Sequence, residues 1–557
     1  MSPAKEELTT HIRLGSLRVS HESLFLLACV LLAFLIRFFF IPQEYVINGD
    51  GAYYTILGER FVSGNFSGGI SAYWSPLYSV LTGFSSLLFA DRDFSGRFVS
   101  LVAGSLLIVP AFFLIRDFFG RPSAYVGAIL LIFHPFLIKS SGWVMTESVY
   151  TFVLTTCVLS GWHAVSKGDS RFFLVTGLLL GIAFLTKPEA IGYLLLILLL
   201  TPAAKFVFGH LSFARVGFNC LVLLLGFAFF FLPYVLYLHE KTGEWTFSQK
   251  ITVNLPAADF EGGLLTLSGD GRMTLKDRLW GDDYETEYIP EKSVVEEAPA
   301  SFSLGRLAND AKILGSKAAT LLWHQLRNYF PAILPIPFAI FAVAGFFFLS
   351  WNRTRAAKEI YLFSFVMCTL LGYAASAVEL RYLIPIIPLL IAWAARGIAE
   401  FCEWLARTVK SFFTTRRELS PVVLATCVLI LLFGLSMPRS LLILKQEDIK
   451  NVPFEEKSAG LWMKENSNHE QTTVISSHIT PAYYAHAKHL YLPDEELSTV
   501  VEYARQRRAN YLVFSERRKS DAAAFLAEKN SSLGSLDLVY HDRQNAGYQI
   551  LVYQLNH

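Results

Sequence analysis

The sequence has 557 residues, of which 53% are hydrophobic and 15% aromatic, and its mean hydropathy is +0.42. A soluble protein of this length must cover its surface with polar side chains, so this composition excludes a soluble globular protein and indicates an integral membrane protein. The formal net charge of only +2 gives no indication of nucleic-acid binding.

Apolar stretches long enough to cross roughly 30 Å of hydrocarbon predict about eleven membrane-spanning helices. They lie at residues 23–41, 98–115, 123–139, 148–165, 172–186, 190–208, 216–238, 331–350, 359–377, 382–398 and 421–438. We keep the first span in the mature protein, because its long apolar run is followed by Pro42, Gln43 and Glu44 rather than by a small-residue cleavage site.

Lys and Arg in the short loops predict the orientation, because they are retained on the cytoplasmic side during insertion. The basic residues that fall on one side are Arg13, Arg18, Arg116, Arg121, Lys167, Arg171, Lys205, Arg215, Arg353, Arg355, Lys358, Arg396, Arg407, Lys410, Arg416 and Arg417. This alternation predicts a cytoplasmic N-terminus and a C-terminal part outside.

Two long segments are expected on the outer side, at residues 43–97 and 239–330. In the first, Ala52–Ser63 is predicted as a helix on the membrane surface, and Pro76–Phe89 as an interfacial or re-entrant helix. In the second, Asp259 to Glu297 holds eleven acidic residues against four basic ones, which is typical of a solvated loop that can also cover a site or receive an acceptor.

Residues 441–557 differ in character from the membrane domain at residues 1–440 and predict a small outer α/β domain of roughly 110 residues. The predicted strands are Thr472–Ser477, Asn510–Ser515, Leu536–His541 and Tyr548–Gln554, and the predicted helices are Pro481–Lys488, Leu497–Arg508 and Asp521–Lys529. No Gly-rich phosphate loop or catalytic triad is recognisable there, so binding, positioning or stability is the expected role.

Four polar clusters fall at the same ends of otherwise apolar helices, which predicts one reaction centre at the outer membrane surface. They are Asn48-Gly49-Asp50, Thr146-Glu147, Thr186-Lys187-Pro188-Glu189 and Glu379-Leu380-Arg381-Tyr382.

Asp50 is the candidate general base. It lies between two glycines, where the backbone can turn tightly, and a partly desolvated carboxylate has a raised proton affinity that suits it to accept a proton from a hydroxyl. The alternative is that Asp50 caps the following helix. Glu147 opens the fourth span, where it caps that helix, binds a polar substrate, or does both.

Lys187 and Arg381 are the candidates for stabilising a departing phosphate, with Tyr382 as a hydroxyl donor. The alternative for Lys187 is an ion pair with Glu189. Arg37, near the outer end of the first span, is expected to extend its charge to the interface, with a position facing the phosphate as the alternative.

The cysteines and histidines predict neither a disulfide framework nor a metal site. The six cysteines lie in or beside predicted spans without a CxxC pair, and the 13 histidines form no HxxxH or HxH pair.

Eight short motifs follow one another along the chain: Gly49-Asp50-Gly51-Ala52-Tyr53-Tyr54, Gly58-Glu59-Arg60-Phe61, Ser75-Pro76-Leu77-Tyr78, Met145-Thr146-Glu147-Ser148, Gly181 to Glu189, Pro233-Tyr234, Thr242-Gly243-Glu244 and Leu380 to Pro388. In this order, they make the sequence similar to the GT-C superfamily of membrane glycosyltransferases. The resemblance is to the bacterial family 39-like branch, which includes protein O-mannosyltransferases and the lipid A aminoarabinose transferase.

The resemblance covers the membrane region to about residue 440 and implies a polyprenyl-phosphate-linked sugar donor, an outer-face active site and inversion at the anomeric carbon. It implies a bacterial inner-membrane protein whose C-terminal domain is periplasmic, acting on a glycan, lipid or protein acceptor with no required cofactor or metal. The implied catalytic residues are Asp50 and Glu147, and the phosphate-binding residues are Lys187, Arg381 and Tyr382. Further substrate-binding candidates are Tyr53, Tyr54, Tyr73, Trp74 and Glu189.

Two departures from well-known members bear on the activity. Eukaryotic mannosyltransferases pair Asp with Glu in the first outer loop, whereas Gly51 follows Asp50 here. The chain also lacks the WWDYG-type motif of oligosaccharyltransferases, which disfavours block transfer to asparagine. A lipid or sugar transporter remains the non-enzyme alternative, and a lipid-linked oligosaccharide ligase is the nearest alternative among enzymes.

Overall fold

The computed structural model describes most of the chain and divides it into two compact units. The described residues are 11–14, 17–41, 45–208, 212–243, 245–248, 316, 318–347, 351–374, 379–412, 420–467, 472–492, 497–518, 536–543 and 548–555. Unit 1 comprises Met1–Ile41, Arg97–Leu232 and Ser316–Leu441, and unit 2 comprises Pro42–Gly96, Pro233–Gly315 and Leu442–His557. The predicted acidic stretch and the predicted helix Asp521–Lys529 lie outside the described residues.

Unit 1 is a helical bundle preceded by a short hairpin of β1 (His11–Leu14) and β2 (Leu17–Ser20). Its helices are α1 (His21–Phe39), α5 (Arg92–Leu106), α6 (Ile108–Phe119), α7 (Arg121–Ile132), α8 (Pro135–Ser140), α9 (Glu147–Lys167), α10 (Ser170–Thr186), α11 (Ala190–Phe208), α12 (Phe213–Thr242), the π-helical η1 (Gln325–Tyr329), α16 (Phe330–Ile333), α17 (Ile336–Phe347), α18 (Arg353–Ala374), the 3-10 helix η2 (Leu380–Ile386), α19 (Ile387–Phe412) and α20 (Pro421–Asn451). The first residues of α5 and the last residues of α12 and α20 belong to unit 2.

The apolar helices of the described residues correspond to the predicted spans. Seven are long and apolar enough to cross a membrane: His21–Phe39, Arg92–Phe119, Glu147–Lys167, Ala190–Val207, Phe213–Lys241, Arg353–Ala374 and Leu380–Val409. Ala318–Ile333 and Ile336–Phe347 form a bent pair that counts as an eighth span if taken together. Shorter apolar helices at Arg121–Ile132, Ser170–Thr186 and Pro421–Ser436 occupy the remaining predicted positions. The prediction of a polytopic helical membrane protein is confirmed.

Two predicted spans are interrupted where the sequence analysis expected one helix each. The stretch 123–139 breaks at His134, and the stretch 331–350 breaks at Leu334, where the chain bends by 102°. Both residues precede a proline and have extended backbone angles, ψ 119° at His134 and ψ 87° at Leu334. A proline ring disfavours helical geometry in the residue before it, which explains both breaks.

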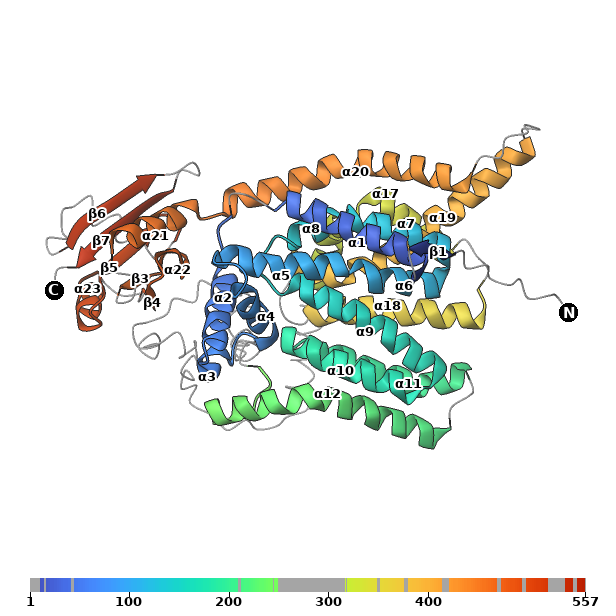
Figure 1. Cartoon of the computed structure of the whole chain (residues 1–557), viewed down its shortest axis with the longest axis horizontal. Helices are drawn as coiled ribbons and strands as arrows, with labels where there is room; N and C mark the ends of the chain where they lie inside the picture. Colours follow the sequence, from blue (N-terminus) through green and yellow to red (C-terminus); the bar gives the residue numbers. More distant parts are fainter. Residues whose placement is uncertain are drawn as a thin grey trace. The chain divides into compact units, whose positions relative to one another are not determined.

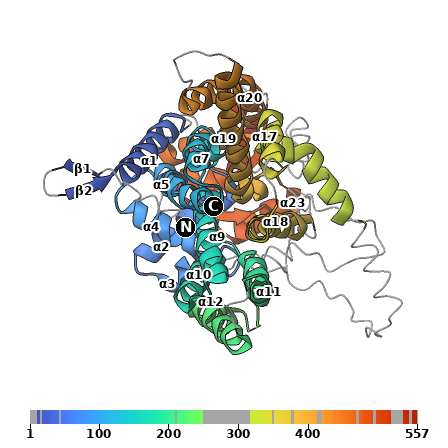
Figure 2. The same cartoon turned by 90° about the vertical axis from the view of Figure 1, so that its right-hand side faces the viewer.

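Burial separates the interior helices of unit 1 from those at its rim. In the most apolar stretch of Leu380–Val409, 89% of the residues are buried, and in that of α9, 78% are buried. The corresponding shares are only 22% in α1 and 33% in Ala190–Val207. In the end-on view of Figure 2, α9 lies toward the middle of the unit and α1 and α11 lie at its edge. The exposed face of α1 presents Leu27, Leu31 and Leu35, as expected of a helix that faces lipid.

Arg37 does not reach the interface, which corrects the expectation for this residue. Its side chain is fully buried, and its guanidinium donates hydrogen bonds to the carbonyls of Leu131 at 3.1 Å, Ile132 at 3.4 Å and Ala33 at 3.2 Å. The break at His134 leaves the last carbonyls of α7 without helical partners, and Arg37 satisfies two of them.

In unit 2, α2 (Gly49–Val62) packs against α4 (Pro76–Ser86), with the single turn α3 (Phe66–Gly69) between them. The two helices approach so closely that a Cβ on Gly58 would lie 2.4 Å from the Ser79 carbonyl oxygen. Both helices were predicted, with ends that differ by a few residues.

The C-terminal part of unit 2 is an α/β domain with a mixed sheet of strand order β4-β3-β5-β7-β6 (Figure 1). Its elements are α21 (Phe454–Asn466), β3 (Thr473–Ser476), α22 (Thr480–Ala485), β4 (Lys488–Tyr491), α23 (Leu497–Gln506), β5 (Tyr511–Ser515), β6 (Leu536–Arg543) and β7 (Gln549–Leu555). Strands β4, β3 and β5 are parallel, and β7 and β6 extend the sheet with antiparallel pairing.

Alternation along the strands buries both faces of this sheet. On β3, Val474 packs with residues of α21 and α22, whereas its neighbour Ile475 packs with residues of α23. The predicted helix Pro481–Lys488 is too long: it ends at Ala485 because His486 adopts a left-handed conformation (φ 54°), and Lys488 begins β4, a strand that was not predicted.

Candidate active site

The predicted site residues fall into two groups, one in each unit. Asp50, Tyr53, Tyr54, Tyr73 and Trp74 belong to unit 2, and Glu147, Lys187, Glu189, Arg381 and Tyr382 belong to unit 1. A single reaction centre that uses both groups stays a prediction.

Asp50 is not the cap of the helix that follows it. The N-cap of α2 is Asn48, whose Oδ1 accepts a hydrogen bond from the Gly51 amide at 2.7 Å. Asp50 lies in the first helical turn, half-buried, and its Oδ1 accepts a hydrogen bond from Trp74 Nε1 at 3.0 Å. Since Asn48 performs the capping, the Asp50 carboxylate is positioned for another role.

Through Trp74, this carboxylate joins a group of aromatic side chains; we call Asp50, Tyr53, Tyr73 and Trp74 the Asp50 cluster. The Tyr53 and Trp74 rings stack with centroids 3.9 Å apart, and Tyr73 meets Trp74 edge-on at 4.6 Å. The Ser71 hydroxyl accepts hydrogen bonds from the amides of Tyr73 and Trp74, each at 3.0 Å, and so fixes the turn that carries both rings. Tyr54 faces elsewhere, with its ring against Tyr78.

The start of α2 is fastened to the C-terminal domain within unit 2. The Tyr484 hydroxyl accepts a hydrogen bond from the Ile47 amide at 2.9 Å and donates one to Asp93 Oδ2 at 2.8 Å. Burial, with a smaller contribution from the Asp93 charge, raises the pKa of Tyr484, so its hydroxyl stays a neutral donor. The Tyr53 and Tyr491 hydroxyls are also hydrogen-bonded, at 2.7 Å.

In unit 1, Glu147 and Lys187 form a buried ion pair. Glu147 is the first residue of α9, and Lys187 is the C-cap of α10. Lys187 Nζ lies 3.0 Å from Glu147 Oε1, and the two side chains are 11% and 1% exposed. The second oxygen, Glu147 Oε2, is buried and accepts no hydrogen bond from the described residues. The pair therefore keeps one carboxylate oxygen available to a hydrogen-bond donor.

Arg381 and Tyr382 lie at the start of η2 and share the carboxylate of Glu379. Arg381 Nε is 2.5 Å from Glu379 Oε2, and the Tyr382 hydroxyl donates to Glu379 Oε1 at 3.3 Å. Lys187 Nζ lies 5.3 Å from the centre of the Tyr382 ring, and Arg381 also contacts Met145 Sδ at 3.9 Å. The helix ends thus gather two cations; we call Met145, Glu147, Lys187, Glu379, Arg381 and Tyr382 the Glu147 cluster.

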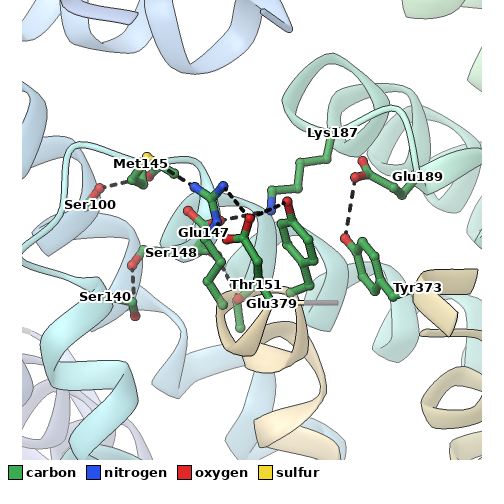
Figure 3. Close-up of polar contacts among 12 residues, drawn as sticks. Ser100, Ser140, Met145, Glu147, Ser148, Thr151, Lys187, Glu189, Tyr373 and Glu379 are labelled. Carbon is green, nitrogen blue, oxygen red and sulfur yellow. Dashed lines mark hydrogen bonds and ion pairs between the residues drawn. The ribbon is translucent and has the colours of Figure 1, made fainter. Parts of the chain in front are cut away.

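Glu189 does not pair with Lys187, which corrects that alternative. The Lys187 side chain turns to Glu147, and the Tyr373 hydroxyl contacts Glu189 Oε1 at 3.5 Å (Figure 3). The Tyr373 ring stacks on Tyr382 with centroids 4.7 Å apart. Tyr373 therefore contacts both Glu189 and Tyr382, a member of the Glu147 cluster.

Sequence reasoning missed three members of this arrangement: Tyr373, Tyr150 and Met145. Lys187 Nζ lies 5.8 Å from the Tyr150 ring centre, and the buried Tyr150 hydroxyl has no hydrogen-bond partner among the described residues. Tyr150 lies one helical turn after Glu147 and therefore shares its helix face, a signal that the sequence contained. Tyr373 is separated from the Glu189 motif by well over 100 residues, so no local pattern links them.

No group of three or more His, Cys, Asp or Glu side chains suited to a metal ion occurs in the part of the chain that the structure describes. The six cysteines are all free thiols.

The model of one protein family, described as dolichyl-phosphate-mannose-protein mannosyltransferase, matches residues 74–237. Curated relatives include the undecaprenyl phosphate-α-4-amino-4-deoxy-L-arabinose arabinosyl transferases of Edwardsiella ictaluri and Pseudomonas aeruginosa. The former is 26% identical over 27% of this chain and 26% of its own length. The latter is 26% identical over 38% of this chain and 37% of its own length. The chain therefore matches less than two fifths of the length of these relatives.

Solved structures match over much more of the chain. The apo structure of ArnT from Cupriavidus metallidurans has a TM-score of 0.58 at 14% identity and covers 95% of this chain and 97% of its own. The oligosaccharyltransferase AglB from Archaeoglobus fulgidus has a TM-score of 0.54 at 14% identity over 88% of this chain and 69% of its own. The chain therefore shares the fold of these two solved proteins over most of its length. Together with the family model and the curated relatives, this confirms the resemblance that its sequence motifs carry.

Proposed function

We propose that the chain is an inverting glycosyltransferase that moves a sugar from a polyprenyl-phosphate-linked donor to an acceptor hydroxyl on the outer face of the membrane. The observation that carries the proposal is the Glu147 cluster, where two cations meet at helix ends around a buried carboxylate with one oxygen unfilled. Cations at the end of apolar spans are suited to a lipid phosphate, and the free oxygen is suited to a sugar hydroxyl or amine.

In the proposed reaction, the Asp50 carboxylate accepts the proton of the acceptor hydroxyl. The hydroxyl oxygen then forms a bond to the anomeric carbon while the bond from that carbon to the phosphate oxygen breaks. The electron pair of the broken bond leaves with the polyprenyl phosphate, and attack from the opposite side inverts the anomeric centre. Lys187, Arg381 and the Tyr382 hydroxyl stabilise the charge that develops on the phosphate.

Glu147 has two tasks in this proposal, one for each oxygen. Oε1 holds the Lys187 ammonium group in place, and Oε2 accepts a hydrogen bond from the donor sugar. The half-buried Tyr73 ring, at the edge of the stacked and buried Tyr53 and Trp74 rings, supplies an apolar surface for the acceptor in this proposal. This chemistry requires no cofactor, since the leaving group is a phosphate ester that basic side chains can stabilise.

Named complexes of similar structures support a lipid-linked donor. One ArnT structure from Cupriavidus metallidurans is bound to undecaprenyl phosphate, and its TM-score to this chain is 0.53. The AglB structure contains a dolichol-phosphate and an inhibitory peptide. The acceptor in this proposal is a glycan, a lipid or a protein.

The apolar helices and the bacterial relatives make the chain a multi-pass protein of the bacterial inner membrane. The alternation of basic loops supports a cytoplasmic N-terminus and a periplasmic C-terminal domain as part of the proposal. A periplasmic site agrees with an undecaprenyl or similar carrier presented at the outer leaflet.

The first test is mass spectrometry of protein purified in native lipids, comparing wild type with Asp50→Asn for a bound polyprenyl-phosphate sugar. We expect the variant to retain the donor while turnover falls by about 10²- to 10⁴-fold, the usual contribution of a general base. Turnover is followed as release of polyprenyl phosphate after membranes from a strain lacking the gene are added as acceptor.

Asp91→Asn is the matched control, because Asp91 caps α5 through the Phe94 amide and asparagine caps equally well. Absence of the donor from both folded wild type and Asp50→Asn would favour a transporter or a different donor. A multi-sugar donor on the retained lipid would instead identify a lipid-linked oligosaccharide ligase.

A further inference from the structure

The C-terminal domain contacts the chain on both sides of Asp50, beginning with the segment before it. The Ile47 amide donates a hydrogen bond to the Tyr484 hydroxyl at 2.9 Å. The Tyr45 carbonyl accepts a hydrogen bond from Lys457 Nζ at 2.6 Å. Tyr484 lies on α22 and Lys457 on α21, so two helices of the domain contact the five residues that precede Asp50.

Two further contacts of the domain fall within the first turns of α2. A Cβ on Gly49 would lie 3.1 Å from His478 Nε2, so the imidazole packs against the residue directly before Asp50. One turn further along, the Tyr53 hydroxyl is hydrogen-bonded to the Tyr491 hydroxyl of β4 at 2.7 Å. All of these residues belong to unit 2. A shift of the first turn of α2 would therefore break contacts with α21, α22, β4 and the loop after β3.

The hydroxyl of the buried Tyr484 has a fixed orientation. It donates its single proton to Asp93 Oδ2 at 2.8 Å, which leaves a lone pair of its oxygen for the Ile47 amide. Lys457 Nζ lies 3.9 Å from the same Asp93 oxygen and 4.8 Å from the centre of the Tyr484 ring. The carboxylate thus orients the hydroxyl, and the ammonium group contacts both. We call Asp93, Lys457 and Tyr484 the Tyr484 network.

The start of α2 needs this support more than the rest of the helix does. Further along, α2 packs closely on α4 at Gly58. Residues 45–48 form no regular structure, and helix ends fray unless other contacts hold them. A catalytic group must be held within about 0.5 Å of its productive position, and a misplacement of about 1 Å can cost 10²-fold in rate. The Tyr484 network is therefore placed where it bears on the position of Asp50.

We propose that the C-terminal domain positions the base of the reaction, with Tyr484 and Lys457 as positioning residues for Asp50. Tyr484 holds the backbone amide three residues before Asp50, and Lys457 holds Tyr484 together with the Tyr45 carbonyl. Neither side chain contacts the substrate in this proposal. The role of Asp50 as the base rests on the proposed function, whereas the fastening of the start of α2 does not.

Tyr484→Phe is the first test, because it removes one hydroxyl and keeps the buried ring. Full-length protein in lipid nanodiscs receives increasing amounts of acceptor membranes, and the release of polyprenyl phosphate is followed. We expect the maximal rate to fall by roughly tenfold. Donor retention and the amount of membranes that gives the half-maximal rate should stay at their wild-type values. A variant that is merely less folded would lose donor retention and maximal rate in parallel.

Hydrogen exchange measures the fastening of α2 without any turnover. Peptides covering residues 45–55 should exchange roughly tenfold faster in Tyr484→Phe, the effect of one lost hydrogen bond. Tyr540→Phe is the matched control, because it removes the same group from the same domain, where the Tyr540 hydroxyl donates to Asp542 on its own strand at 3.1 Å. It should leave both the exchange of residues 45–55 and the maximal rate unchanged.

Lys457→Met is a second test that decides the result if Tyr484→Phe does not fold. The Lys457 side chain is 28% exposed, so its replacement leaves the core of the domain intact. The variant frees the Tyr45 carbonyl and removes the cation beside Asp93, so the maximal rate should fall several-fold and residues 45–55 should exchange faster. Lys457→Arg keeps a cation that can donate hydrogen bonds, and it should restore most of the rate.

Unchanged exchange of residues 45–55, or an unchanged maximal rate, in the folded variants would overturn the positioning role. So would equal losses in Tyr540→Phe, because they would reflect the domain as a whole. A wild type that releases no polyprenyl phosphate would remove the proposed function instead. Faster exchange in Tyr484→Phe would then still support the fastening of α2 by the domain, and unchanged exchange would overturn it.

Discussion

Among the described residues of unit 1, the buried carboxylates of Glu147 and Glu359 have different surroundings. Glu359 lies on α18 and is 1% exposed; Oε1 accepts a hydrogen bond from Arg396 at 2.8 Å and contacts Arg355 at 3.5 Å, and Oε2 accepts one from Trp393 at 2.6 Å. Glu147 is equally buried, but only Oε1 has a hydrogen-bonded partner, whereas Oε2 has none among the described residues.

The difference separates a structural network from a candidate binding site. In the Glu359 network, defined by Arg355, Glu359, Trp393 and Arg396, every carboxylate oxygen is satisfied within the protein, so a ligand would gain nothing there. The Glu147 cluster keeps one oxygen unfilled, which is costly unless a substrate supplies the missing donor. Since Tyr373 follows Glu359 by 14 positions on α18, the two charged regions are separated by about 21 Å along the same helix.

Glu147→Gln and Glu359→Gln compare the two carboxylates directly and have the largest expected effect. We expect Glu147→Gln to lower turnover by about 10²-fold or more, because the glutamine no longer binds Lys187 as an anion or accepts a strong hydrogen bond from the donor. Glu359→Gln should leave turnover within a few-fold of wild type and lower thermal stability instead, because Arg355 and Arg396 lose their charged partner.

Release of polyprenyl phosphate and thermal unfolding in the same nanodisc preparation measure both effects. Equal loss of turnover in the two variants, at equal stability, would remove the distinction between the two regions.

A second prediction concerns the stability of the Lys187–Glu147 pair. Lys187→Met removes the ammonium group that lies 3.0 Å from the buried Glu147 carboxylate. Removal of one partner of a buried ion pair lowers the free energy of unfolding by about 3–5 kcal/mol. The double variant Glu147→Gln/Lys187→Met should recover most of that stability while turnover stays low. Thermal unfolding of the two single variants and the double variant gives the coupling energy; a double variant no more stable than Lys187→Met would show that the pair does not contribute in this way.

The sequence predicted the membrane fold well because its signals are local. Apolar runs and basic loops mark each span without reference to the rest of the chain. The errors also have local causes, since the breaks at His134 and Leu334 follow from the proline after each, a signal that was present in the sequence and not used. The strand β4 was missed because its four residues, Lys488–Tyr491, alternate too briefly to be recognised.

The candidate site was predicted only in part because its geometry depends on contacts between distant segments. The motif positions of Glu147, Lys187 and Arg381 were predicted, and the structure brings them together. That Lys187 pairs with Glu147 rather than with nearby Glu189 depends on how α9 and α10 pack, which no sequence spacing specifies. The roles of these residues stay predictions.

A third prediction distinguishes a phosphate-binding arginine from a structural one. Arg381→Lys keeps the charge but loses the planar fork that can hold two phosphate oxygens, so donor retention during purification should fall by roughly tenfold. The Arg381 side chain is 22% exposed, so the effect on stability should be small. Arg396→Lys is the control, and its donor retention should equal that of wild type; a similar fall in both variants would indicate a general loss of the membrane fold.

Glu456 in the C-terminal domain is a further buried carboxylate and gives the smallest predicted effect. Its Oε1 accepts a hydrogen bond from Arg518 at 2.8 Å, and its Oε2 lies 3.5 Å from His478 Nδ1. Burial alone would raise the pKa of Glu456, but the neighbouring His478 and Arg518 outweigh it and hold the pKa below its usual value. A carboxyl whose pKa is lower in the folded protein stabilises the fold above its unfolded pKa of about 4.3, and this contribution disappears as the pH falls through the folded value.

Hydrogen exchange of peptides covering β3 and β5, corrected for the intrinsic pH dependence, measures this contribution in the acidic range. The protection of wild type should fall with decreasing pH below about 4.3 more steeply than that of Glu456→Gln, which lacks the titrating group. Glu465→Gln, on the exposed side of α21, the helix that also carries Glu456, should follow the wild-type curve. Parallel curves for wild type and Glu456→Gln would mean that the carboxylate is not held as an anion by Arg518.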